Sequence, residues 1–132
     1  MGLIVDTGIF IRAEREAHRD PVANFSSGEE LGICSITLSE LLEGVHYAKS
    51  DLQAERRRAF VTRIRSVFPV IPFGETIAEI HAGLRARQRL SGKTIGAHDL
   101  IIAATAVSLG WDVLTFNATE FRQVEGLQVR VA

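Results

Sequence analysis

Short apolar runs alternate with longer helical patterns along the sequence, and this alternation limits the folds open to the chain. The runs are short enough to be buried strands, and the stretches between them carry apolar residues at the spacing of a helix face. The order predicts an α/β fold: a three-layer α/β/α sandwich around a central, mostly parallel sheet of four to five strands. The expected strands cover residues 3–5, 32–36, 68–72, 112–116 and 127–131, and the expected helices cover 9–16, 37–49, 51–66, 75–90 and 100–109.

Two further segments are less regular. Residues 117–121 favour a turn or a short helix, and Asp20-Pro21 favours a helix start because proline suits the first helical position. The chain has 132 residues, 46% of them apolar, so we expect one compact domain over residues 1–132.

The charge balance and the cysteine usage exclude several classes of protein. Lys and Arg total 15 and Asp and Glu total 16, a net charge of −1, which argues against a module held on nucleic acid by its overall charge. The lone Cys34 cannot form an internal disulfide and is typical of a small core residue, which indicates a reducing compartment. Without an apparent signal peptide or a transmembrane run, we expect a soluble cytoplasmic protein with no membrane contact.

Acidic side chains recur where the expected strands end. Asp6 follows the first strand, Glu40 lies just past the second, and Asp99 opens the apolar helix. Each also has a purely structural explanation: Asp6 suits a helix N-cap, Glu40 closes a Thr37-to-Glu40 capping box, and Asp99 suits a helix N-terminus. Together they are better explained by function, because parallel α/β sheets bind ligands outside the carboxyl ends of their strands.

The strand at 112–116 adds a fourth group of polar side chains at the same edge. Thr115, Asn117 and Glu120 follow one another there, although a capped turn would use the same residues. Carboxylates brought together repel one another unless a proton or a cation intervenes. Oxygen ligands suit Mg²⁺ or Mn²⁺, and the scattered histidines show no zinc-ligand spacing. The sequence therefore predicts a divalent-cation site at this edge.

Basic residues near the acids are candidates for phosphate contacts. Arg87, Arg89 and Lys93, with Arg85, form a basic stretch shortly before Asp99. The stretch would be a solvated helix end with favourable dipole interactions, or it would position phosphates without reading sequence. Arg12 is a second candidate for such a contact.

The polar motifs, taken in order, resemble a PIN domain of the VapC type, the toxin of bacterial toxin–antitoxin pairs. The resemblance spans nearly the whole chain, and its last two motifs are the most specific. The matching segments are Leu3-Ile4-Val5-Asp6-Thr7, Ser39-Glu40-Leu41, His98-Asp99-Leu100-Ile101-Ile102-Ala103-Ala104-Thr105-Ala106 and Leu114-Thr115-Phe116-Asn117-Ala118-Thr119-Glu120-Phe121.

The resemblance implies a metal-dependent endoribonuclease in which three acids, Asp6, Glu40 and Asp99, hold Mg²⁺ or Mn²⁺. Asn117 stands where many members have Asp and others have Asn, so Asn117 and Glu120 are the two candidates for the fourth catalytic position, with Glu120 able to supply the missing charge. The resemblance also implies an RNA substrate, a small VapB-type antitoxin partner, a homodimer, and inhibition of translation and growth.

Two threonines also fall on the resemblance: Thr7 and Thr115 offer hydroxyls near the expected site, for substrate. Gly8 follows Thr7 where Ser or Asn is commoner in the family.

Alternative functions stay open at this point. A housekeeping RNA-processing nuclease would share the same acids, and a binding module that has lost activity would share the fold. A phosphoryl-transfer or phosphatase-like α/β domain also uses an acid at a strand end. It expects paired acids there or a second Asp two residues after Asp6, where this chain has Gly8.

Overall fold

The computed structural model describes residues 1–132 except 17–19, 21, 23–24 and 26–27. Its centre is a five-stranded sheet in the order β3-β2-β1-β4-β5, with every neighbouring pair parallel. The strands are β1 (Gly2–Val5), β2 (Glu30–Cys34), β3 (Val70–Ile71), β4 (Asp112–Thr115) and β5 (Val129–Val131). The expected parallel α/β sheet is therefore confirmed.

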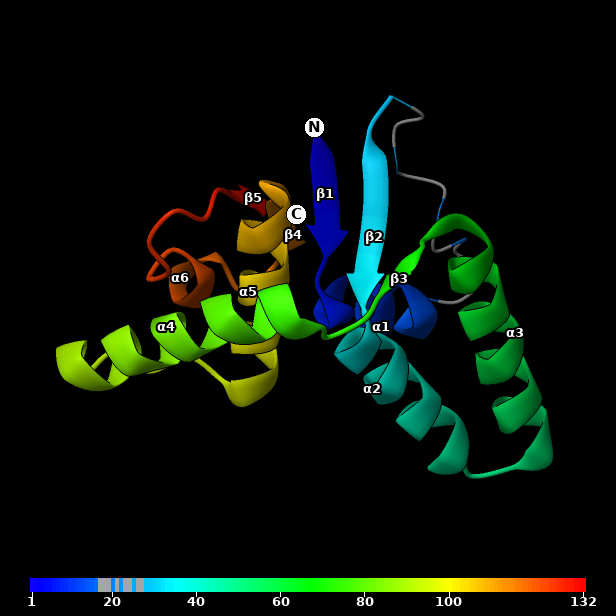
Figure 1. The fold of residues 1–132 in the computed structure, drawn as a ribbon. Coiled ribbons are helices and arrows are strands. Elements are labelled where there is room, and N and C mark those ends of the chain that lie inside the picture. Colours follow the sequence, from blue (N-terminus) through cyan, green and yellow to red (C-terminus); the bar gives the residue numbers. More distant parts are fainter. Residues whose placement is uncertain (17–19, 21, 23–24, 26–27) are drawn as a thin grey trace.

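Helices cover both faces of the sheet (Figure 1). On one face pack α1 (Thr7–Arg15), α2 (Ser35–His46) and α3 (Asp51–Val67); on the other pack α4 (Glu75–Ser91), α5 (Ala97–Leu109) and α6 (Ala118–Phe121). The alternation of side chains along each strand builds the two cores: Leu3 and Val5 join the first, and Ile4 joins the second. This is the expected three-layer sandwich.

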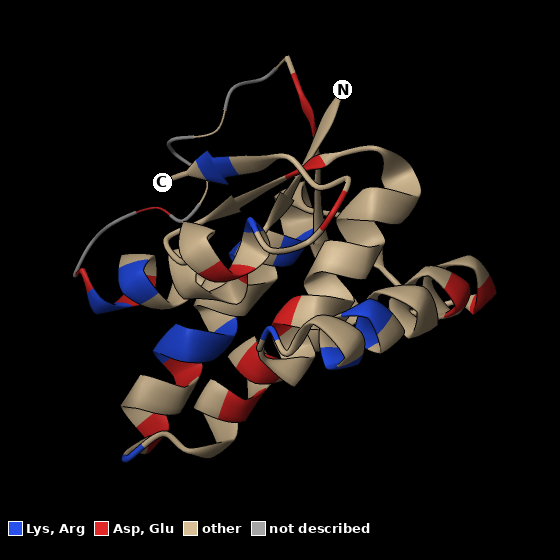
Figure 2. Cartoon of the chain, turned by 90° about the vertical axis from the view of Figure 1, so that its left-hand side faces the viewer, with Lys and Arg blue, Asp and Glu red and all other residues tan. Residues whose placement is uncertain are grey.

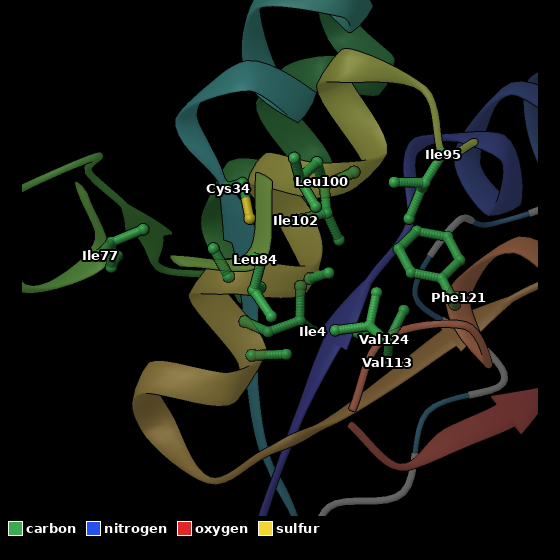
Figure 3. Close-up of a cluster of buried hydrophobic side chains, with 13 residues drawn as sticks. Ile4, Cys34, Ile77, Leu84, Ile95, Leu100, Ile102, Val113, Phe121 and Val124 are labelled. Carbon is green, nitrogen blue, oxygen red and sulfur yellow. The ribbon is translucent and has the colours of Figure 1, made fainter. Parts of the chain in front are cut away.

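The core around α5 fixes the start of that helix. Leu100, Ile102, Ala103, Ala104 and Ala106 are all at most 2% exposed. Figure 3 shows Leu100 and Ile102 among side chains from the sheet, α4 and the segment after β4. A helix that is apolar nearly all round has no solvent face along which it could shift, so its first turn is held firmly against the sheet.

The element boundaries differ from the sequence expectations at several ends. Helix α2 begins two residues earlier, at Ser35, and α5 begins three residues earlier, at Ala97; both edge strands, β3 and β5, are shorter than expected. The helix start expected at Asp20-Pro21 falls largely outside the described residues. No helix in the described ranges is both long and apolar enough to span a bilayer.

Truncation of the core beside α5 tests the packing. Ile102 is fully buried, so Ile102→Ala should lower the free energy of unfolding by about 3 kcal/mol through lost burial and the cavity left behind. Leu90→Ala removes a side chain that is 89% exposed and should change it by less than about 0.5 kcal/mol. Urea titrations compare the two, and equal losses would contradict this assignment of the core.

Candidate active site at the carboxyl edge of the sheet

Asp6 is buried directly after β1 and is held by a residue of β4. Its side chain is 8% exposed, and its Oδ2 accepts a hydrogen bond from the Thr115 hydroxyl at 2.7 Å. The same Thr115 oxygen accepts from the backbone N–H of Asn117 at 2.8 Å. Asp6 occupies the N-cap position of α1 but its side chain makes no capping bond, so the capping explanation does not hold. Burial raises the pKa of Asp6, although the hydrogen bond from Thr115 opposes the rise.

Glu40 does not belong to a capping box, contrary to the sequence interpretation. Because α2 begins at Ser35, Cys34 takes the N-cap position and Glu40 lies in the second helical turn. Its Oε1 accepts a hydrogen bond from the Thr7 hydroxyl at 2.9 Å. Its Oε2 lies 3.4 Å from Nδ1 of His98, an ion pair when the imidazole is protonated.

Asp99 lies in the first turn of α5, beside a second acid from α6. Burial raises the pKa of Asp99 to about 7, helped by a side-chain hydrogen bond with Glu120 and by the charges of Asp6, Glu120 and Glu40. Glu120 is itself oriented by Asn117, whose Nδ2 donates to Glu120 Oε2 at 2.9 Å. Both candidates for the fourth catalytic position therefore lie beside Asp99: Glu120 contributes a carboxylate, and Asn117 donates a hydrogen bond to it.

We call Asp6, Glu40, Asp99 and Glu120 the carboxylate cluster. Few positively charged side chains among the described residues balance its negative charge. In the part of the chain that the structure describes, no Lys or Arg forms an ion pair with any of the four, and His98 contacts Glu40. The all-oxygen donor set fits Mg²⁺ or Mn²⁺. Among the described residues, no three His, Cys, Asp or Glu side chains are close enough together to hold a metal ion as they stand, so a bound cation would have to draw the carboxylates together.

The other predicted residues take varied places. Arg87, Arg89 and Lys93 are all exposed; Arg87 and Lys93 line a pocket of about 180 Å³ beside α5, and Arg89 does not. Arg12 lies 4.6 Å from the ring centre of Phe116, a cation–π contact. Lys and Arg segments are otherwise spread among acidic ones over several helices (Figure 2), as the near-zero net charge implies.

Three further residues near the site, Thr37, Gly8 and Cys34, differ in their surroundings. Thr37, fully buried, has its hydroxyl 3.0 Å from that of Thr7, and the sequence had suggested only a helix cap for it. Gly8 has open space around it, because an added Cβ would meet nothing within 4 Å. Cys34 is buried and its thiol pKa is raised to about 11, so it stays protonated and is a core residue, as expected.

The parallel sheet and its edge of carboxylates are those of a known family: residues 3–127 match the PIN domain, and the chain belongs to the PIN domain family. Within it, the chain is similar to Ribonuclease VapC1 of Rickettsia felis, with 37% identity over 98% of this chain and 95% of the relative. It is also similar to a protein of Salmonella typhimurium named tRNA(fMet)-specific endonuclease VapC, with 34% identity over 96% of this chain and 93% of the relative.

A solved structure supports the same relationship. The crystal structure of DNA-bound VapBC from Salmonella typhimurium contains a chain with a TM-score of 0.86 and 27% identity, covering 99% of this chain and 98% of that one. The resemblance inferred from the motifs is therefore confirmed, and the phosphoryl-transfer alternative is set aside.

The raised pKa of Asp99 predicts how the metal-free protein responds to pH. The usual Asp pKa is 3.8 and the folded value is about 7, so between them the folded protein binds more protons than the unfolded chain. The contribution of Asp99 to stability is therefore full below the unfolded pKa and is lost as pH rises through the folded one. With a chelator present, the melting temperature should fall between about pH 4 and about pH 7.

Asp99→Asn should flatten that fall and raise the melting temperature at the alkaline end. Asp51→Asn is the matched control, because Asp51 also lies in the first turn of a helix but is exposed and away from the cluster. A fall that persists unchanged in Asp99→Asn would contradict the assignment.

Proposed function

We propose that the chain is a divalent-metal-dependent endoribonuclease in which Asp6, Glu40 and Asp99 hold Mg²⁺ or Mn²⁺, with Glu120 completing the set of acids. The observation that carries this is the cluster itself, where Asp99 has a pKa raised to about 7 and no Lys or Arg of the described chain offsets the charge. A cation bound there would polarise the scissile phosphate and lower the pKa of an attacking water. Relatives named as VapC ribonucleases support the proposal.

The chain's own residues would divide the work. Asp99 or Glu40 would orient or deprotonate the attacking water, while Asp6 stays fixed by Thr115. Asn117 would keep Glu120 turned toward Asp99. The resemblance places Thr7 and Thr115 near substrate, but their hydroxyls donate to Glu40 and Asp6, which favours a role in orienting those acids.

The RNA strand would pass over the pocket lined by Arg87 and Lys93. Leu100, next to Asp99 on α5, forms part of that pocket, and Gln123, one turn after Glu120, forms another part. Two residues of the pocket lining are thus close in sequence to acids of the cluster, although none of the four acids lines the pocket. Arg87 and Lys93 would bind phosphates there and offset the repulsion between RNA and the acids, without reading its sequence.

We extend the pairing named for the solved relative to this chain, so that a small VapB-type antitoxin would bind and inhibit it. RNA cleavage without the antitoxin would inhibit translation and growth. A cytoplasmic homodimer is the arrangement that we expect. Co-purification of the product of an adjacent small reading frame would distinguish a toxin from a housekeeping RNA-processing nuclease.

Cleavage assays test the catalytic proposal. With Mg²⁺ or Mn²⁺, the protein should cut RNA, and Asp99→Asn should reduce kcat at least about 100-fold, as loss of a positioned acid or base does. Because a relative is named for tRNA(fMet), that tRNA should be included with rRNA and mRNA. Asp51→Asn should retain activity. Cleavage that survives both chelation and Asp99→Asn would refute the proposal.

Salt-dependent binding tests the RNA path. In the inactive Asp99→Asn background, Arg87→Gln should weaken binding of single-stranded RNA and lower the slope of log affinity against log salt by about 0.7, one phosphate contact. Arg89→Gln, a change of the same kind two residues along α4 but outside the pocket, should leave the slope unchanged. Equal effects of both variants would indicate a diffuse charge effect and contradict a path over the pocket.

A further inference from the structure

The hydroxyl of Thr37 lies beneath the carboxylate cluster, out of reach of solvent. Thr37 is 0% exposed and Thr7 is 5% exposed, and their two hydroxyl oxygens are 3.0 Å apart. The Thr7 oxygen is also 2.9 Å from Glu40 Oε1. A continuous chain of hydrogen bonds therefore runs from a fully buried side chain to an acid of the cluster.

The direction of the hydrogen bonds in this chain follows from the number of protons available. Each hydroxyl has one proton and can accept from two donors, while an ionised carboxylate only accepts. The Thr7 hydroxyl is within donating distance of both the Thr37 hydroxyl and Glu40 Oε1 but has a single proton; when that proton is donated to an ionised Glu40, Thr7 accepts from Thr37. The Thr37 hydroxyl thereby decides where the Thr7 proton points, and the Thr7 proton fixes one oxygen of Glu40.

The placement of these residues makes the chain of bonds rigid. Thr37 and Glu40 are three positions apart on α2, so they lie on one helix face and hold Thr7 between them. Thr7 is the first residue of α1, directly after Asp6. A valine has the shape of threonine and would fill this dry position without any polar group to satisfy, so packing alone does not account for the hydroxyl.

We propose that Thr37 is a positioning residue for Glu40 and acts through the Thr7 hydroxyl. It would hold Glu40 ready to bind the cation, as outer-shell hydrogen bonds orient metal ligands elsewhere. This deepens the proposed function, on which it rests, by assigning the support beneath one of its ligands. Thr115 gives Asp6 direct support at 2.7 Å, and Thr7 gives Glu40 direct support at 2.9 Å, with Thr37 behind Thr7 at 3.0 Å.

The test removes the Thr37 hydroxyl and keeps the side-chain shape. Thr37→Val should weaken Mn²⁺ binding, measured by calorimetry or electron paramagnetic resonance, and lower kcat, each by about 10-fold, with KM for RNA little changed. Thr37→Ser, which keeps the hydroxyl, should recover most of both. If the valine variant does not fold, Thr37→Cys replaces it, since a thiol is a weak donor of similar size.

Thr105→Val is the matched control. Thr105 is 1% exposed and donates its hydroxyl to the backbone oxygen of Ile101 at 2.8 Å, so this variant makes the same chemical change in a buried helix without touching the cluster. It should keep wild-type Mn²⁺ affinity and kcat whatever its melting temperature.

The outcomes separate the two proposals. Weaker Mn²⁺ binding in Thr37→Val but not in Thr37→Ser or Thr105→Val supports the positioning role, even if the wild-type protein cleaves no RNA and the nuclease proposal fails. Wild-type Mn²⁺ affinity and kcat in Thr37→Val, or equal losses in Thr105→Val, would overturn the positioning role while leaving the nuclease proposal intact.

Discussion

The parallel pairing of β1 with β4 is the contact on which the site depends. The backbone N–H of Asp6 donates to the carbonyl of Leu114 at 3.0 Å, and one residue later the Thr115 hydroxyl reaches the Asp6 carboxylate. The two residues are 109 positions apart, so the bond forms only when the central sheet has assembled. The same register places Asn117 and α6 beside the edge, which brings Glu120 to the cluster.

The fold holds the carboxylates of the cluster together although their burial and mutual repulsion are unfavourable. Burial raises the pKa of both Asp6 and Asp99, which means that their charged forms are less favourable in the fold than in water. The cores on the two faces of the sheet supply the opposing free energy, above all the apolar helix α5 that carries Asp99. Carboxyl groups with perturbed pKa values are concentrated at functional sites, where a bound ligand can stabilise their charged forms.

Much of the fold could be predicted from the sequence because hydrophobic periodicity is a local property. The run Leu3-Ile4-Val5 ends at Asp6 in the structure as expected, and all five expected strands are present. The first residues of the helices were predicted less accurately. Helix α2 begins at Ser35, two residues before the predicted start, so Thr37 lies inside the helix and not at its cap. The roles of the site residues remain predictions.

The side-chain contacts of the site could not be predicted from the sequence, for a physical reason. Asn117 and Glu120 were competing candidates for one role, and the structure instead has one holding the other through a hydrogen bond. Thr7 and Thr115 were expected near substrate, yet their short side chains meet carboxylates from other elements. Such contacts depend on distances between elements that are remote in sequence, which periodicity does not encode.

The edges of the sheet have a consequence for the chain outside the site. Exposed strand edges offer unpaired backbone groups that recruit other chains into aggregates, and short edges limit that risk. Here β3 has two residues and β5 has three, and β5 carries Arg130, whose guanidinium is engaged by Asp112 at 2.8 Å and by Glu29 at 2.6 Å. At high concentration in a cell, copies of this protein therefore have little edge strand through which they could add to one another's sheets and aggregate.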